Sequence, residues 1–115
     1  MYKWKIINFH PILLPSFAGL NAIDQALESS ALIMGNTAHF IDKGIDAGPI
    51  IMQNIISKFD YEGYQSFVNL QLIMLKQISI WLNENRIVIE GGSVHVKDAN
   101  YTIGDFIPAV EFITK

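Results

Sequence analysis

The stretch NFHPILLPSF, from Asn8 to Phe17, constrains the fold of this chain more than any other feature of its sequence. It overlaps an aromatic and β-branched run, Tyr2 to Phe9, which predicts a strand. Pro11 keeps His10 extended, because the proline ring disfavours helical geometry in the preceding residue. Side chains alternate along a strand, so Asn8 and His10 lie on the same face. An amide and an imidazole are therefore predicted together, where a strand meets a rigid apolar loop.

Composition narrows the classes of protein that the chain can belong to. Its 115 residues suffice for one domain with a core, and we expect a single domain over 1–115. A net charge of −3 without a lysine or arginine run argues against nucleic acid and anionic membranes, and favours small-molecule substrates. The absence of cysteine excludes disulfides and thiol catalysis. No apolar run reaches the roughly 18 residues of a membrane span, so we expect a soluble, cytoplasmic protein.

Two strand patterns flank a loop rich in glycine and aspartate. The first strand pattern is Leu32 to Ile41, and the second is the apolar run IIMQNII after Pro49, which predicts burial on both faces. Between them, DKGIDAGP predicts an irregular loop. A short helix is expected before these strands, from the N-cap Asn21 to about Ser29 or Ser30.

The carboxyl-terminal half predicts one long helix and a hairpin. Asp60 is expected to cap a helix over Tyr61 to Asn83, whose apolar stripe would cover one face of a sheet. The pair Gly91 and Gly92, between RIVIE and SVHVK, predicts a tight β-turn. The expected fold class is α/β, with a short mixed sheet, a long covering helix and a carboxyl-terminal β-hairpin.

Three residues, Asn8, His10 and Asp46, form a candidate catalytic set. An imidazole transfers protons near neutral pH, and a nearby carboxylate favours its charged form. An amide donor stabilises a developing oxyanion. Acyl transfer to an amine needs these groups. Spacing alone leaves a second interpretation open, in which His10 is a hydrogen-bonded structural residue and Asp46 a turn residue.

Other polar residues have simpler interpretations. His39, in TAHFI, is either a hydrogen-bonded core histidine, which we favour, or a side chain pointing into the site. His95 is expected to be solvated in the hairpin, and Asp42 taken alone fits a turn. No HExxH or comparable ligand spacing is present, so no metal site is expected.

Two long runs resemble a known family. NFHPILLPSFAGLNAIDQAL, followed by GNTAHFIDKGIDAGPIIMQ, resembles the carboxyl-terminal half of the folate-dependent formyltransferases, and within them the glycinamide ribonucleotide formyltransferases. The family's Asn-X-His-Pro and Asp-X-Gly-Pro motifs occur here as residues 8–11 and 46–49. The likeness is sharpest from Lys5 to Gln53. It implies the carboxyl-terminal half of a Rossmann-like formyltransferase fold.

The resemblance also implies an activity, which is transfer of the formyl group of 10-formyltetrahydrofolate to a primary amine without a metal. Its catalytic residues would be His10 as acid and base, Asn8 as hydrogen-bond donor, and Asp46 tuning His10 or accepting the amine proton. Contacts to the folate would come from the loop residues Asp42, Gly44, Ile45 and Asp46. Glycinamide ribonucleotide is the expected acceptor, and an amino sugar is the alternative. Hydrolysis of formyltetrahydrofolate would use the same three residues. The Leu14-Pro15 peptide is expected to be cis.

Family members also carry an amino-terminal, nucleotide-binding half with a glycine-rich phosphate turn. No Gly-x-Gly-x-x-Gly run occurs in this sequence. We therefore expect the chain to supply the catalytic half of a site, as a homo-oligomer or with a separate chain that provides the missing half. The alternative is a non-catalytic fragment or interaction module that retains the motif.

Overall fold

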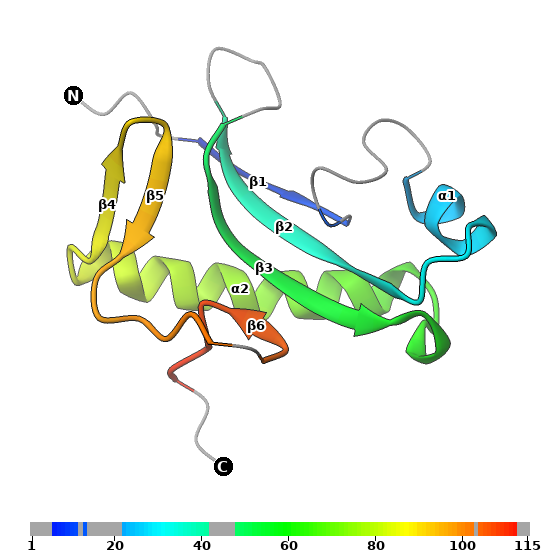
Figure 1. Ribbon diagram of the computed structural model, residues 1–115. Coiled ribbons are helices and arrows are strands. Elements are labelled where there is room, and N and C mark those ends of the chain that lie inside the picture. The colour runs from blue at the N-terminus through cyan, green and yellow to red at the C-terminus, as the bar shows by residue number, and fades with distance from the viewer. Residues whose placement is uncertain (1–5, 12, 14–21, 42–47, 103, 113–115) are drawn as a thin grey trace.

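The computed structural model describes residues 6–11, 13, 22–41, 48–102 and 104–112. Figure 1 shows a sheet with one long helix along it and a hairpin at one end. The elements, in chain order, are β1 (Ile6–His10), α1 (Ala22–Glu28), β2 (Ile33–Ile41), β3 (Ile50–Ser57), the 3-10 helix η1 (Lys58–Asp60), α2 (Tyr64–Asn83), β4 (Ile87–Glu90), β5 (Ser93–Val96) and β6 (Phe106–Ile107). No helix in the described part of the chain is long and apolar enough to cross a membrane.

The main sheet has the strand order β1-β2-β3-β6, and each neighbouring pair is antiparallel. The predicted α/β class with a long helix is confirmed. The described strands, however, pair in antiparallel rather than mixed fashion. The connection from Ile41 to Ile50 explains the β2-β3 pairing, because a parallel pair needs a crossover of about a dozen residues or more. From Ile51 to Ser57 every residue of β3 is buried or half-buried, as its apolar run predicts.

The main core lies between the sheet and α2. It combines alternate residues of β2, their neighbours on β3, one stripe of α2 and one hairpin residue, namely Ala38, Phe40, Ile51, Met52, Met74, Ile78, Trp81 and Val96. Because alternate residues of β2 face α2, the residues between them lie on the opposite face of the sheet. Ile7 and Phe9 of β1 also pack against this core, which directs Asn8 and His10 away from it.

The start of α2 differs from the prediction. The helix begins at Tyr64 with Gly63 as its N-cap, and Asp60 ends η1 instead of capping α2. Ser57 accounts for the difference, since its hydroxyl accepts a hydrogen bond from the Phe59 amide (3.2 Å) and stabilises the 3-10 turn. Gly63 has φ of +105°, a conformation that favours glycine.

The carboxyl-terminal hairpin is confirmed. Gly91 and Gly92 have φ of +56° and +81°, the signs that a type I′ turn requires at both central residues. After the hairpin, the chain returns to α2, where Arg86 contacts both carboxylate oxygens of Glu111 at 2.8 and 3.0 Å. The Trp81 indole N–H donates to the same carboxylate (3.1 Å). These bonds raise the pKa of Arg86 and lower that of Glu111. They attach the carboxyl-terminal segment to the end of α2.

Candidate active site

A row of polar side chains crosses the face of the sheet that points away from α2. Asn8 pairs with His39, His10 pairs with Thr37, and Thr37 pairs in turn with Gln53. Residues directly opposite one another project from the same face of a sheet. The five side chains therefore share one surface, which we call the polar face, although they come from three strands.

Contacts within the polar face hold several of its members in place. The rings of His10 and His39 are stacked, with centroids 5.2 Å apart and planes 5° from parallel. The Gln53 amide donates to the Thr37 hydroxyl at 2.9 Å. Thr37 and His39 are fully buried, whereas Asn8 and His10 are half-buried. Asn8 and His10 are thus exposed enough to meet a substrate, whereas Thr37 and His39 on the neighbouring strand are not.

The second motif meets the same part of β2. Phe40 donates its backbone N–H to the Pro49 carbonyl (3.0 Å), and Gly48 lies so close that a Cβ there would be 1.7 Å from the Phe40 carbonyl oxygen. That oxygen also accepts from Nδ1 of His39 at 2.9 Å. The Gly48-Pro49 end of the Asp-X-Gly-Pro motif therefore packs one residue away from His39.

Asn8 and His10 share a face as expected. Asp46 and the other expected folate contacts, Asp42, Gly44 and Ile45, lie outside the described residues, as does the Leu14-Pro15 peptide. His39 is buried and hydrogen-bonded, as favoured for a core histidine, and its ring also contacts His10. His95 is exposed as expected, and it stacks on Tyr101.

Two members of the polar face, Thr37 and Gln53, were not singled out from the sequence. A signal for Thr37 exists in the alternation of Thr37 and His39 along one strand. Gln53 can be assigned to the polar face only when the register of β2 and β3 is known. Within the described ranges, no group of three histidine, aspartate or glutamate side chains could hold a metal ion.

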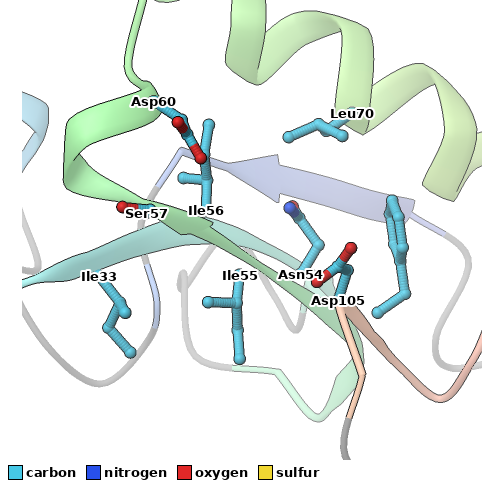
Figure 2. Close-up of a pocket in the computed structure, with 9 residues that line it drawn as sticks. Ile33, Asn54, Ile55, Ile56, Ser57, Asp60, Leu70 and Asp105 are labelled. Carbon is cyan, nitrogen blue, oxygen red and sulfur yellow. The ribbon is translucent and has the colours of Figure 1, made fainter.

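A separate pocket lies at the outer edge of β3 (Figure 2). β6 pairs only with Gln53 and Asn54, and the pocket opens along β3 beyond that pairing. Figure 2 shows Asp60 and Asp105, from two distant segments, at the rim, with Leu70 of α2 above Asn54. None of its lining residues belongs to the polar face, so the pocket is not part of the candidate active site.

The fold of this chain is similar to that of solved enzymes that act on formyl groups. Phosphoribosylglycinamide formyltransferase from Anaplasma phagocytophilum matches with a TM-score of 0.71 and 34% identity, over 81% of this chain and 48% of that one. A formyltetrahydrofolate deformylase from Pseudomonas syringae matches with a TM-score of 0.66 and 27% identity, over 80% of this chain and 32% of that one.

Comparison of the sequence identifies the family. Residues 1–66 match the formyl transferase family, to which this chain belongs. The chain is 49% identical over 55 residues to phosphoribosylglycinamide formyltransferase of Bacillus subtilis, a match that covers 48% of this chain and 28% of that protein. The chain thus spans less than half the length of these relatives. The family resemblance seen in the two motifs is confirmed.

Proposed function

We propose that this chain provides the catalytic half of a site that transfers a formyl group from 10-formyltetrahydrofolate to a primary amine, with glycinamide ribonucleotide as the acceptor. The observation that carries the proposal is the placement of Asn8 and His10 side by side on the polar face. Similarity to the Bacillus subtilis enzyme supports the choice of acceptor. The donor set fits a formyl donor, because amide and imidazole N–H groups both hydrogen-bond to a carbonyl oxygen.

The residues divide the chemistry between them. 10-Formyltetrahydrofolate supplies the formyl group. As the acceptor nitrogen forms its bond to the formyl carbon, Asn8 donates a hydrogen bond to the formyl oxygen and stabilises its developing negative charge. His10 moves the proton from the acceptor amine towards the nitrogen of the folate as the bond from that nitrogen to carbon breaks. Asp46 favours the charged form of His10 or receives the amine proton through water. Asp42, Gly44, Ile45 and Asp46 contact the folate.

The deformylase reaction is the second candidate function. The similarity to the Pseudomonas syringae formyltetrahydrofolate deformylase favours it, and water would then take the place of the amine. The products separate the two reactions, since hydrolysis releases formate in the absence of any amine. An amino-sugar acceptor is tested by the same assay with that amine in place of glycinamide ribonucleotide.

Exposed apolar residues on α2 point to the partner that would complete the site. Tyr64, Leu72, Leu75 and Leu82 are 45 to 58% exposed and share one flank of the helix, which we call the leucine flank. Leu75 and Leu82 directly follow the buried Met74 and Trp81, so the leucine flank is turned about 100° from the core-facing stripe. Apolar side chains grouped in this way mark an interaction surface.

The position of the leucine flank favours one occupant. Gln77, on the other flank of α2, binds the backbone N–H of Glu111, and Glu111 follows β6. Because β6 and β1 are at opposite ends of the sheet, the leucine flank faces the β1 end.

We propose that residues 1–115 form one domain without a nucleotide-binding half. In this proposal, the remaining half of the family fold covers β1 and the leucine flank, within a longer polypeptide or as a separate chain. The chain spans 48% of the Anaplasma phagocytophilum structure, which leaves a segment of suitable size.

Sedimentation velocity tests the partner. The chain is mixed with the segment of the Anaplasma phagocytophilum enzyme that it does not cover, and a heterodimer is expected. Leu72→Glu combined with Leu75→Glu should abolish the complex, and Asn69→Glu, on the exposed helix face, should not. A homodimer that excludes the segment, or a chain that stays monomeric at high micromolar concentration with the segment present, would contradict the proposed occupant.

Formyl transfer itself is tested with 10-formyltetrahydrofolate and glycinamide ribonucleotide, with and without the complementary segment. We expect little turnover by the chain alone, because half of the positioning surface is absent. In the complex, His10→Ala should lower kcat by roughly 10²–10⁴-fold. Asn8→Ala should cost roughly 2.7–4 kcal/mol of transition-state stabilisation, and Asp46→Asn should lose most of the rate. His95→Ala is the control. No turnover in either preparation would favour the non-catalytic interaction module.

A further inference from the structure

We propose that His39 is a positioning residue for His10, and that it connects His10 of the Asn-X-His-Pro motif to Gly48-Pro49 of the Asp-X-Gly-Pro motif. The proposal rests on the proposed function, since it assigns His39 a role in that site. It begins from a torsional property of histidine, whose ring rotates about a broad χ2 minimum. An imidazole at the end of a strand therefore needs a neighbour to fix the plane in which it donates or accepts a proton.

The stacked ring of His39 provides that neighbour. His39 is opposite Asn8 in the β1-β2 register, so His10 is its diagonal neighbour on the same face. Their ring planes are 5° from parallel at 5.2 Å. A rotation of the His10 ring about χ2 would break this stacking. The stacking therefore holds the plane in which the His10 nitrogen atoms transfer a proton.

His39 is itself held by the main chain. A carbonyl oxygen can only accept, so the 2.9 Å contact between Nδ1 and the Phe40 oxygen places a hydrogen on Nδ1 of His39. The residue is fully buried, and the register of β2 with β3 shifts between Ala38 and His39. Such irregularities re-aim side chains next to functional sites. The hydrogen bond and the burial together fix the orientation of the His39 ring.

The same carbonyl joins His39 to the second motif. Phe40 is bound through its N–H to Pro49, and its carbonyl oxygen leaves no room for a side chain at Gly48. The contacts therefore run without a gap from Gly48-Pro49, through Phe40 and His39, to His10 of the first motif. Through these contacts, Gly48-Pro49 of the second motif and the imidazole of His10 are set relative to one another.

NMR of the imidazole rings tests the proposal without requiring turnover. The chain has three histidines, so the signals lost in His95→Gln are those of His95, the signals lost in His39→Leu are those of His39, and the remaining set belongs to His10. In the unmodified chain, we expect nuclear Overhauser contacts between the His10 and His39 rings. In His39→Leu, the His10 ring protons should move downfield as the stacked ring is lost. In His39→Phe, which retains a ring of similar size, they should stay close to their original positions.

Kinetics of the active complex provide the second readout. His39→Leu should lower kcat by roughly tenfold to 10²-fold, the range expected when a catalytic group is misplaced by about an ångström, with KM within twofold of the unmodified value. His39→Phe should recover part of this loss, and His95→Gln should have no effect. His10 signals that are the same in His39→Leu and the unmodified chain would overturn the proposal. If His39→Leu fails to fold, the absence of the His10-His39 contact in the unmodified chain would overturn it equally. An inactive complex with the expected NMR result would refute the proposed function and leave the positioning of His10 supported.

Discussion

Replacement of Gly48 by alanine is the most direct test of the packing between the Asp-X-Gly-Pro motif and β2. An added Cβ would lie 1.7 Å from the Phe40 carbonyl oxygen and 2.5 Å from its carbon, whereas real Cβ contacts are essentially never below 3.0 Å. Both atoms belong to the backbone, so no side-chain rotation relieves the clash. The two segments must separate by more than an ångström.

The cost follows from what that separation disrupts. Overpacking in a well-packed region costs about 1–3 kcal/mol. The N–H of Phe40 would also lose its bond to Pro49, which contributes about 0.5–1.5 kcal/mol. We therefore expect Gly48→Ala to lower the free energy of unfolding by about 2–4 kcal/mol.

Urea denaturation followed by circular dichroism measures this change. Gly104→Ala is the matched control, because the nearest atom to its Cβ would be 3.8 Å away, an ordinary contact. The control should be neutral or stabilising by about 0.4–1 kcal/mol, since alanine reduces the entropy of the unfolded chain. A Gly48→Ala variant within about 0.5 kcal/mol of the unmodified chain, the usual range of a surface substitution, would refute the packing argument.

Three further predictions concern the core and the carboxyl-terminal segment. Asn36→Leu should lower the unfolding free energy by about 3 kcal/mol in urea denaturation. The buried Asn36 amide hydrogen-bonds Asn54, Phe67 and Gln71, and each buried group left without a partner costs about 1–3 kcal/mol. A change similar to that of the exposed Asn83→Leu would contradict this role. Met74→Ala should cost about 2–5 kcal/mol by the same measurement, as a fully buried side chain is removed from the core, while Leu72→Ala on the exposed flank should cost much less. Glu111→Gln should lower the free energy of unfolding at pH 7 but not in acid. Arg86 holds the folded-state pKa of Glu111 below its unfolded value. The stabilisation is therefore present above about pH 4.3 and is lost as the pH falls through the lowered pKa. Urea midpoints that differ equally at pH 7 and pH 3 would count against that pairing.

Local patterns were enough to predict most of the elements. Alternation and β-branched content located β1, β2 and β3, and the paired glycines located the turn between β4 and β5. The start of α2 was wrong because two adjacent signals competed. Asp60 is a good N-cap, but Ser57 nucleates a 3-10 turn that incorporates it, and Gly63 takes the cap at a positive φ. The choice between them depends on the path of the chain leaving β3, which no short window contains.

The candidate site also contains some residues that the sequence predicts and others that only the structure reveals. Asn8 and His10 share a face by alternation within one strand, so the sequence predicts their proximity. Thr37 and Gln53 are 16 residues apart in sequence and meet through the register of two strands. The contact of His39 with His10 likewise depends on the pairing of β1 with β2. Single-strand alternation places residues on a face, but pairing register determines their neighbours.

The register that assembles the polar face is determined by the opposite face of the sheet. A slip of one residue in β1 would exchange its two faces. Asn8 and His10 would then point towards the core cluster that includes Met74 and Trp81, while Ile7 and Phe9 would leave it. Each polar group buried without a partner costs about 1–3 kcal/mol, and the burial of an aromatic side chain would be lost in addition. The hydrophobic residues of β1 thus specify where its polar residues lie. The geometry of the candidate active site is consequently a product of core packing as much as of the polar contacts themselves.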